Sequence, residues 1–527
     1  MHKYTTLPLF FCGMAILLLW FYFPIAFDNN DDQIIYGICA GIFTGTPSSH
    51  IVLSHIFIGK FLQYLFSTFP GFNFYTLYLE LVLLCCFIAM GKTVTTRINT
   101  SIFYYWFIPI FIFLGLFSLV VVSIQFTMVA ILCAVTTLLL LQSNVTDKYK
   151  IIVGLLFIVL AILIRKESFY IFLLFVVPLY LLQDKTEKST TRKVVFISII
   201  LFALLMIINN NDRIYKQQKT YRNIETLNIL ATQPIQYDSI KINKAGFSIE
   251  DISIIKWWFL ADDSYWNSEK LNHLAKEIRT IRNMDEVVQE LKIFIELERY
   301  SILIFLLSLA LVLWANPQKR KLVLFNTFIL LSIIVLLLTC AHLPFRVSNP
   351  IFIYLILTHI YYSINSEKKS ILKTSALLLL FVFAVYKFNC VLKLSDVHHQ
   401  NEQQFKAYMD DINNHPEYTF VFIDAFPFHL MNAWKKPETF FKYPNILISG
   451  WYAYTPDYAT FLKQRKLKNL STDLIGKEQV VFLCRYNDVL KTYLDVLQQR
   501  YAKKFKVVSL PTTAFKILAP KKLVLEN

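Results

Sequence analysis

The sequence predicts an α-helical polytopic membrane protein with about eleven transmembrane helices and a small α/β domain at its carboxyl end. The first observation is composition. Of the 527 residues, 56% are hydrophobic and only 17% are charged, and the mean hydropathy is +0.49, outside the range of soluble domains. The second observation is that long apolar runs recur as far as residue 385. The third is that short β-rich runs replace them after residue 396.

Each apolar run is a candidate membrane span, because about 20 apolar residues cross the hydrocarbon core as a helix. We interpret the first run as a retained helix and not as a secretory signal. Lys3 is the only lysine or arginine before it, and no small-x-small cleavage site follows. The candidate spans are residues 7–26, 74–90, 102–119, 124–141, 151–164, 169–182, 194–208, 302–314, 322–339, 351–364 and 371–385.

The net charge of +16 is concentrated in short loops between these spans. By the positive-inside rule, such loops lie on the cytoplasmic side of the membrane. This distribution accounts for the charge without a nucleic-acid partner. The five basic connections contain Lys92 and Arg97; Lys148 and Lys150; Lys185, Lys188, Arg192 and Lys193; Lys319, Arg320 and Lys321; and Lys368, Lys369 and Lys373.

The segment 50–73 decides the topology. If the amino terminus is inside, a single return span before Lys92 places all five basic connections in the cytoplasm. We therefore predict that residues 50–69, which include two histidines and Lys60, form an amphipathic helix on the outer surface and not a span. The transmembrane domain, residues 1–395, then presents an acidic first outer loop (28–73) and an outer helical loop (209–299).

Residues 396–527 are predicted to form an extracytoplasmic α/β domain. The runs "YTFVFIDAF", "NILISG", "QVVFLCRY" and "KVVSL" are short and rich in β-branched and aromatic residues, which is typical of strands. A helical pattern at 489–501 is expected to pack against the sheet that these strands form.

Three carboxylates of the first outer loop, Asp28, Asp31 and Asp32, are the candidate catalytic residues. A carboxylate held near a sugar hydroxyl can accept its proton as a general base. The same oxygens suit a divalent cation, which is therefore a possible cofactor. A structural interpretation also remains open, since acids at the amino terminus of a helix cap its N–H groups and favour its dipole.

Other polar side chains fall on the same outer face, where ionisable groups near the membrane are functional candidates. Arg346 stands between two prolines and can bind a phosphate through two hydrogen bonds. Arg165 and Lys166 are further phosphate candidates, although basic side chains at helix ends often only extend to the interface. Histidines and tryptophans on this face can equally fill a core or anchor at the interface. The remaining candidate substrate-binding residues are His50, His55, His342, Trp257 and Trp258.

No P-loop, G-x-G-x-x-G or C-x-x-C motif occurs in the sequence. We therefore expect neither a nucleotide-sugar donor nor a zinc site. The eight cysteines are scattered, mostly within apolar runs, and indicate no disulfide framework.

A first helix, an acidic outer loop with surface helices, many further spans and a small outer tail domain together resemble the GT-C superfamily of membrane glycosyltransferases. The resemblance implies transfer of a sugar from a polyprenyl-phosphate or pyrophosphate donor to a cell-envelope glycan or lipid acceptor. The reaction would take place at the outer face of the bacterial cytoplasmic (inner) membrane, with Asp31 or Asp32 as the base and Arg346 as a phosphate contact. The strings "DDQIIYGICAGIFTGTPSSH", "IQFT" and "GFSIEDISIIKWWFLADD" also resemble a family of bacterial multi-pass proteins with no assigned activity.

Three other functions stay open. A polysaccharide polymerase or ligase would use the same class of donor. A lipid-linked glycan transporter is less favoured, because 12 glycines and no visible repeat give little sign of broken helices and duplicated halves. A non-catalytic envelope scaffold is the third, since each acid, arginine and aromatic residue has a structural explanation.

Overall fold

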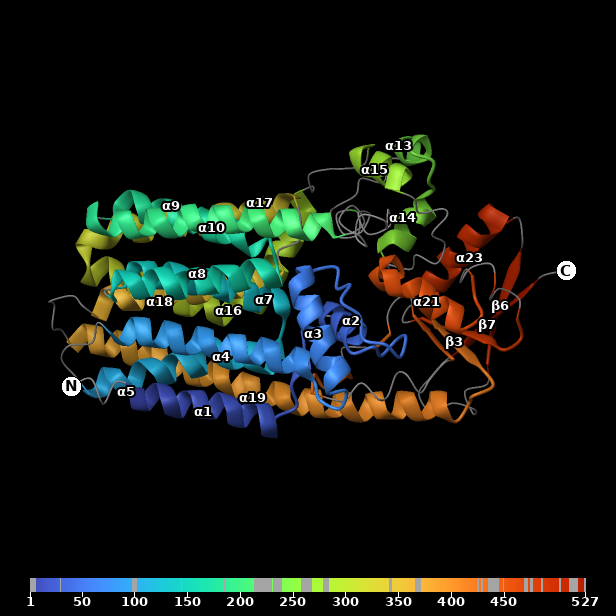
Figure 1. Cartoon of the computed structure of the whole chain (residues 1–527), viewed down its shortest axis with the longest axis horizontal. Coiled ribbons are helices and arrows are strands. Elements are labelled where there is room, and N and C mark those ends of the chain that lie inside the picture. Colours follow the sequence, from blue (N-terminus) through green and yellow to red (C-terminus); the bar gives the residue numbers. More distant parts are fainter. Residues whose placement is uncertain are drawn as a thin grey trace.

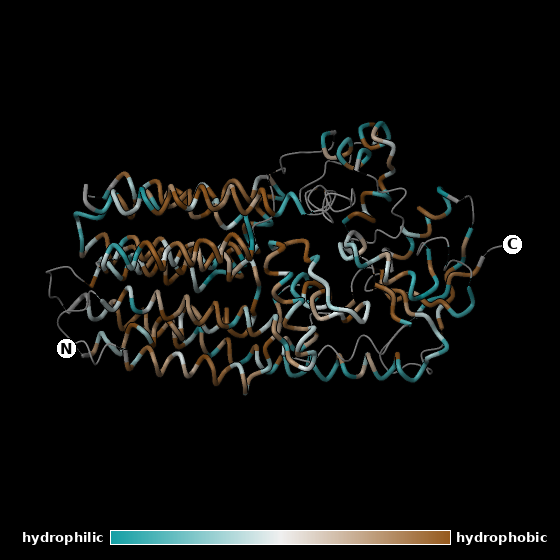
Figure 2. Tube along the Cα trace, viewed as in Figure 1, coloured by the Kyte–Doolittle hydropathy of each residue, from teal (hydrophilic) through white to brown (hydrophobic). Residues whose placement is uncertain are grey.

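The computed structural model is a long bundle of helices joined at one end to a smaller domain with a β-sheet (Figure 1). In Figure 2 the bundle is mainly hydrophobic and the smaller domain is mixed, as the sequence predicts. The structure describes residues 6–28, 30–96, 102–143, 145–183, 185–212, 230, 239–256, 268–277, 284–340, 344–364, 371–423, 426–427, 430–434, 445–448, 450–468, 473, 477–484, 487–501, 504–510 and 520–525.

Each of the apolar runs chosen from the sequence overlaps a helix of the bundle. Within the described residues, seven helices are long and apolar enough to cross a membrane, so the chain is a multi-pass helical membrane protein. The exact number of eleven spans stays a prediction. The helices are α1 (Thr6–Tyr22), α4 (Phe74–Thr95), α5 (Ile102–Phe111) continued by a π-helical segment η2 (Ile112–Phe117) and α6 (Ser118–Val122), α7 (Phe126–Gln142), α8 (Asp147–Ile164), α9 (Ser168–Leu182), α10 (Lys185–Asn211), α16 (Met284–Ala315), η3 (Pro317–Lys319), α17 (Arg320–Cys340), α18 (Phe345–Ile364) and α19 (Ile371–Asn413).

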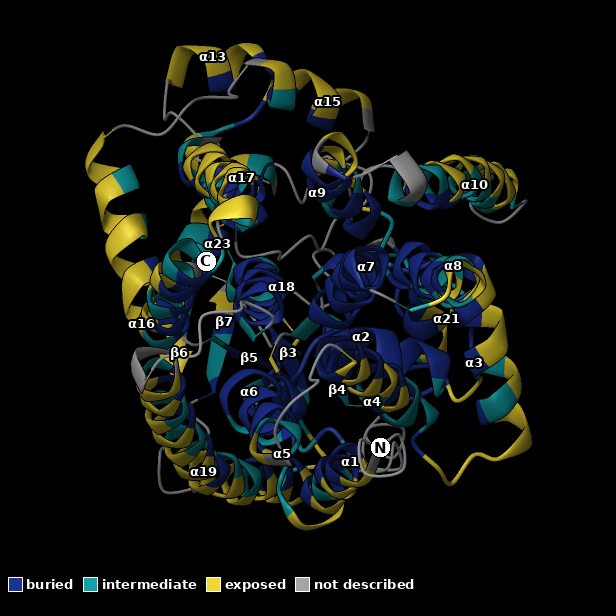
Figure 3. Ribbon diagram, turned by 90° about the vertical axis from the view of Figure 1, so that its left-hand side faces the viewer, coloured by how far each residue is buried: buried dark blue, intermediate teal, exposed yellow. Residues whose placement is uncertain are grey.

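Helix α7 lies in the centre of the bundle (Figure 3). All 17 of its residues are buried, because "FTMVAILCAVTTLLLLQ" is apolar on every side and has no face that favours water. Helices α4, α8, α9 and α18 pack against it. Helices α10, α16, α17 and α19 lie further out and expose large apolar side chains, as expected of a surface in contact with lipid.

The first outer loop packs against the end of the bundle that faces the sheet domain (Figure 1). Strand β1 (Ala26–Phe27) pairs in parallel with β2 (Ser123–Ile124), and helix α2 (Asn30–Cys39) follows. The chain then turns at Gly41, whose φ of 69° favours glycine and whose added Cβ would meet the backbone of Thr46.

Helix α3 (Ile56–Thr68) occupies the segment predicted to lie on the membrane surface. It is amphipathic: Ile58, Leu62 and Phe66 are buried, whereas Phe61 and Tyr64 are exposed. This pattern agrees with a surface helix, and its position on the outer side of a membrane stays a prediction.

The outer helical loop predicted at 209–299 is shorter in the structure, because α10 extends to Asn211 and α16 begins at Met284. The residues described between them include three short helices, α13 (Ser239–Lys244), α14 (Ile249–Lys256) and α15 (Ser268–Glu277).

The tail forms one five-stranded sheet of order β4-β3-β5-β7-β6. Strands β3, β4 and β5 are parallel, and β7 runs antiparallel to its neighbours β5 and β6. The four strands predicted from the sequence are confirmed, and β7 was missed. The elements are β3 (Thr419–Phe422), β4 (Ile446–Ile448), η5 (Trp451–Tyr454), α21 (Pro456–Gln464), β5 (Val480–Leu483), α23 (Asn487–Tyr501), β6 (Phe505–Ser509) and β7 (Lys521–Leu525).

Helix α23 is the helix predicted to pack on this sheet, and its Tyr493 lies next to Phe482 of β5. The helix also packs against α14. The boundary predicted at residue 396 falls inside α19, which runs without interruption from the bundle to Asn413. A continuous helix therefore joins the bundle to the tail domain.

Candidate functional site

The first turn of α2 carries two of the three predicted acids. Backbone pairing brings this turn to the end of the bundle, since β1 pairs with β2 and the Asp28 N–H donates to the Ile124 carbonyl at 3.0 Å. Asp31 and Asp32 then stand in the first turn of the helix, where the N–H groups and the helix dipole favour a carboxylate.

Asp32 is completely buried. Its Oδ1 accepts hydrogen bonds from the Tyr75 hydroxyl at 2.8 Å and from the Phe126 N–H at 3.0 Å. Loss of hydration raises the pKa of Asp32 well above its usual range, and these two hydrogen bonds oppose the rise. Because Tyr75 belongs to α4 and Phe126 begins α7, Asp32 joins three helices at one point.

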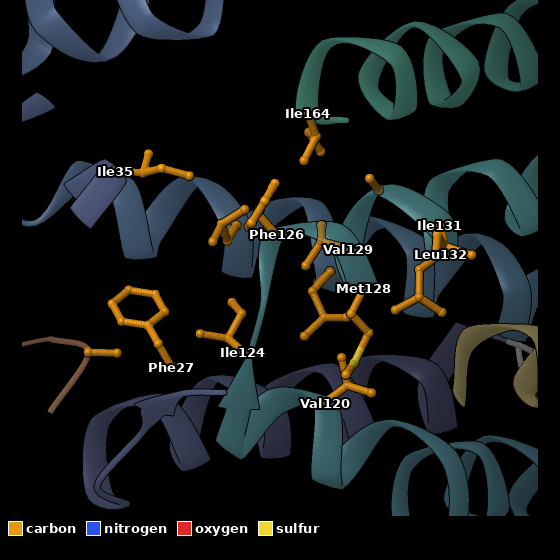
Figure 4. Close-up of a cluster of buried hydrophobic side chains, with 14 of the residues drawn as sticks. Phe27, Ile35, Val120, Ile124, Phe126, Met128, Val129, Ile131, Leu132 and Ile164 are labelled. Atoms are coloured by element: carbon orange, nitrogen blue, oxygen red, sulfur yellow. The ribbon is translucent and has the colours of Figure 1, made fainter. Parts of the chain in front are cut away.

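Phe126, whose N–H contacts Asp32, belongs to a cluster of buried apolar side chains (Figure 4). Phe27, Ile35, Ile124 and Phe126 belong to the same buried cluster and come from β1, α2, β2 and α7. A donor that loses the carboxyl group of Asp32 is therefore left inside a buried, mainly apolar region.

We predict that Asp32→Ala lowers the free energy of unfolding by about 1–3 kcal/mol for each buried donor that loses its acceptor. Asp32→Asn keeps one oxygen as acceptor and is expected to be at least as stable as the wild type. The folded-state pKa of Asp32 is raised, so its stabilising contribution is present below the unfolded pKa and is lost as the pH rises through the folded pKa. The measurement is thermal unfolding in detergent across this pH range. If Asp32→Asn lost as much stability with rising pH as the wild type, the loss would not come from Asp32.

Asp31 is only partly buried and contacts two distant parts of the chain. Its Oδ1 accepts a hydrogen bond from the Trp451 Nε1 at 2.9 Å, and its Oδ2 lies 3.8 Å from Nη1 of Arg346. The side chains of Asp31 and Arg346 remain 21% and 25% exposed, so both can still contact a ligand. Elements α2, α18 and η5 thus meet at one carboxylate.

Asp28 completes the acidic group. Its side chain is exposed, yet the protein around it removes enough hydration to raise its pKa, and the charge of Arg346 opposes this rise. Arg346 interacts electrostatically with all three acids. One guanidinium against three carboxyl groups is an arrangement that can hold an anion at the arginine and accept a proton at an acid.

Within the part of the chain that the structure describes, no three His, Cys, Asp or Glu side chains are placed to hold a metal ion. A divalent cation at the acids Asp28, Asp31 and Asp32 stays a prediction.

The tail domain is fixed to the first outer loop near these acids. The Ala433 carbonyl accepts hydrogen bonds from Asn73 and Thr76 at 2.5 and 2.6 Å, and its N–H donates to the Ile25 carbonyl at 2.7 Å. On the other side of α2, the rings of Phe43 and Tyr452 lie 4.4 Å apart. These contacts hold η5, and with it the indole of the neighbouring tryptophan, against α2.

We predict that Trp451→Phe lowers the sugar transfer proposed below about tenfold, the effect of losing one hydrogen bond to a charged group. Phenylalanine keeps an aromatic ring in this buried position and removes only the N–H that holds Asp31. Trp434→Phe is the matched control, because the Trp434 indole N–H is buried without a hydrogen-bond partner among the described residues. Equal activity of the two variants would contradict a role for the Trp451 N–H.

The predicted histidines have other partners. His55 is buried, caps α3 by accepting the Phe57 N–H at 3.2 Å, and its Nε2 lies 2.9 Å from the Leu205 carbonyl. His50 contacts the Ser48 hydroxyl at 3.0 Å through Nδ1. Burial lowers the pKa of His50, and the charge of Asp457 on α21 opposes this shift. Both histidines therefore support the structure of the loop, and a direct role in binding substrate stays a prediction.

The basic residues after α8 lie beside the amino terminus of α7. The Arg165 guanidinium stacks over the ring of Phe126 with a centroid distance of 5.1 Å, and its Nε lies 3.3 Å from Glu167. Phe126 therefore contacts both residues: its ring lies under the Arg165 guanidinium, and its N–H donates to Asp32. Lys166 is partly buried next to it. The predicted residues His342, Trp257 and Trp258 lie outside the described residues.

The groups that hold the acids were not predicted from the sequence: the side chains of Trp451 and Tyr75 and the backbone N–H of Phe126. The string "SGWYAY" around Trp451 was the available signal, because so dense an aromatic group outside the apolar bundle indicates a contact surface. Nothing in the local sequence of Tyr75 distinguishes it from other aromatic residues of the bundle.

No protein family and no curated protein matches the sequence. Among solved structures, the chain is similar to ArnT from Cupriavidus metallidurans in the apo state, with a TM-score of 0.38 and 10% sequence identity over 98% of this chain and 97% of that chain. Similarity at this level carries no weight for activity, and the function proposed below is supported by the residues of this chain.

Proposed function

We propose that the protein is a GT-C-type membrane glycosyltransferase. It transfers a sugar from a polyprenyl-phosphate or pyrophosphate donor to a cell-envelope glycan or lipid acceptor at the outer face of the bacterial inner membrane. Asp31 is the general base, and Arg346 binds the phosphate of the donor.

The observation that carries the proposal is the contact between Asp31 and Arg346. The chemistry of Asp31 suits proton transfer and that of Arg346 suits phosphate binding, and the two residues lie in distant parts of the sequence. Their side chains approach to 3.8 Å and remain partly exposed at the end of an apolar bundle. A lipid-linked donor needs this combination: apolar surface for the polyprenyl chain, a guanidinium for the phosphate and a carboxylate for the acceptor hydroxyl.

The donor phosphate would compete with Asp31 for Arg346. When the phosphate binds the guanidinium, the salt bridge between Arg346 and Oδ2 of Asp31 is broken and this carboxylate can take the proton of the acceptor, while the Trp451 N–H still holds Oδ1. An acceptor hydroxyl attacks the anomeric carbon as Asp31 takes its proton. The bond from this carbon to the phosphate oxygen breaks, and its electron pair leaves with the polyprenyl phosphate, whose added charge Arg346 stabilises.

The pair of neighbouring acids then has two different roles. Asp32 is completely buried and engaged with Tyr75 and Phe126, so it fixes α2 rather than contacting the acceptor. Arg165, whose guanidinium stacks over Phe126, would contact the second phosphate group if the donor is a pyrophosphate.

The test is a reconstituted assay. Purified protein in proteoliposomes is incubated with a panel of polyprenyl-phosphate sugars and an envelope lipid extract, and mass spectrometry follows the release of polyprenyl phosphate and the mass added to the acceptor. Release of polyprenyl phosphate together with a gain in acceptor mass, both only when the protein is present, supports transfer. Movement of an intact lipid-linked glycan across the membrane would support the transporter, and an unchanged donor panel with unchanged surface glycans in a deletion strain would support the scaffold.

A polymerase or ligase would give a related result with a different unit. In that case the mass added to the acceptor is a whole oligosaccharide, and single-sugar donors remain unused.

A further inference from the structure

Five polar side chains lie buried where α16, α18 and α19 meet. Two of them, Ser348 and Asn349, follow Arg346 closely in α18. The Ser348 hydroxyl donates to Oε1 of Glu298 at 2.5 Å, and Nζ of Lys387 lies 3.2 Å from the Ser301 hydroxyl. The Asn349 amide lies 3.4 Å from the same hydroxyl. All five are at most 5% exposed, and the charges of Glu298 and Lys387 interact. We call this group the polar clamp.

The cost of this group indicates that it has a role. Charged side chains inside an apolar bundle are expensive to bury, and an ion pair there is often no more stabilising than apolar residues of the same size. Leucine or methionine at these positions would hold the helices together equally well. A function that depends on position explains the clamp better than stability does.

The first turn of α18 needs outside support because of Pro350. A residue in this position would normally donate its N–H to the carbonyl of Arg346 four residues earlier, but proline has no N–H and its ring crowds that carbonyl. The turn that carries Arg346 therefore lacks one of its own backbone hydrogen bonds. Ser348, in the same turn, ties it to α16 through Glu298 instead.

Charge strengthens the same contact. The first turn of α18 contains no acidic residue to complement the positive end of its helix dipole. The Glu298 carboxyl group, brought from α16, supplies a negative group at this turn. Lys387 from α19 balances its charge.

We propose that the polar clamp is a positioning device for Arg346, and that Glu298 and Ser348 set the affinity of the protein for the phosphate of its lipid-linked donor. The proposal rests on the proposed function, since it takes Arg346 as the phosphate contact. Glu298 and Ser348 do not contact the donor and act only through the orientation of α18.

The experiment compares Ser348→Ala and Glu298→Gln with Ser308→Ala. Ser308 also joins α16 to α18, through His359 at 2.9 Å, but lies further along both helices from Arg346. Its loss removes one buried contact between the same helices and leaves the first turn of α18 intact. Glu298→Gln keeps the size and an acceptor for Ser348 and removes the charge, so it tests the clamp without a cavity.

Donor affinity is measured by the binding of a fluorescent polyprenyl monophosphate to the protein in nanodiscs, and kcat and KM by the transfer assay. We expect Ser348→Ala and Glu298→Gln to weaken binding and raise the KM for the donor about tenfold. The kcat should fall as well, because a misplaced Arg346 also stabilises the charge of the leaving phosphate less well. Ser308→Ala should leave both values unchanged. In an Arg346→Lys background, Ser348→Ala should have no further effect, since residues that act through one another are not additive.

Three results would overturn the inference: an equal effect of Ser308→Ala, an equal loss from Ser348→Ala in the Arg346→Lys background, or normal binding by both clamp variants while Arg346→Lys binds weakly. In the last case the proposed function stands and only the clamp fails. If Arg346→Lys itself binds and transfers normally, the proposed function fails together with the inference. Thermal unfolding of each variant shows whether it is folded.

Discussion

Replacing Asp31 by asparagine is expected to lower sugar transfer by about 10²–10⁴, the usual contribution of a general base. Asparagine has nearly the same shape and keeps an oxygen that can accept the Trp451 N–H, but it cannot take a proton at neutral pH. The loss should appear in kcat, because the side chain acts in the chemical step. The measurement is the rate of polyprenyl-phosphate release in proteoliposomes with protein amounts matched by quantitative labelling.

Two neighbouring variants serve as controls for Asp31→Asn. Asp32→Asn keeps the buried contacts with Tyr75 and Phe126 and should retain most activity. Asp28→Asn removes an exposed acid that does not accept the Trp451 N–H. It should therefore lower the transfer rate less than Asp31→Asn does. If Asp28→Asn were the inactive variant and Asp31→Asn remained active, the base would be Asp28, whose raised pKa also suits proton transfer. Full activity of all three variants would remove the acids from the mechanism.

The sequence was sufficient to predict the helical bundle, because apolar runs of membrane length report the solvent in which a helix lies. The amphipathic helix α3 was also predictable, since Ile58, Leu62 and Phe66 repeat on one face while Lys60 falls on the other. Strand β7 was missed because "KKLVL" near the carboxyl end is short and begins with two lysines, and its place in the sheet depends on pairing with β6, which the local sequence does not encode.

The candidate site divides in the same way. Asp31 and Arg346 could be chosen because charge near a membrane is unusual wherever it occurs. Their partners could not be chosen, since Trp451 reaches Asp31 only when the tail domain packs on the first outer loop, and that packing depends on carbonyl groups such as that of Ala433. The different burial of Asp31 and Asp32 likewise follows from the rotation of α2, which the two adjacent letters do not reveal.

Replacing Arg346 by lysine is expected to lower kcat/KM for the lipid-linked donor by about 10²–10³, the range found when one group that stabilises developing charge is removed. Lysine keeps the positive charge but is a point charge, whereas the guanidinium can offer two hydrogen bonds to one phosphate. A deficit of this size in a charge-conserving variant would therefore show that geometry matters as well as charge. Arg346→Ala should bind polyprenyl monophosphate still more weakly, because it also leaves Asp28 and Asp31 without their shared cation.

Arg320→Lys is the matched control for Arg346→Lys. Arg320 also stands at the start of a bundle helix and donates to the Leu313 carbonyl at 2.8 Å, yet it is exposed and belongs to one of the basic connections predicted on the cytoplasmic side. Its replacement should leave donor affinity and transfer unchanged. Because Arg346 and Asp31 act on the same bond, the double variant Asp31→Asn with Arg346→Lys should lose less than the product of the two single losses. Strictly multiplicative losses would mean that the two residues act independently, and the contact between them would then have no part in the reaction.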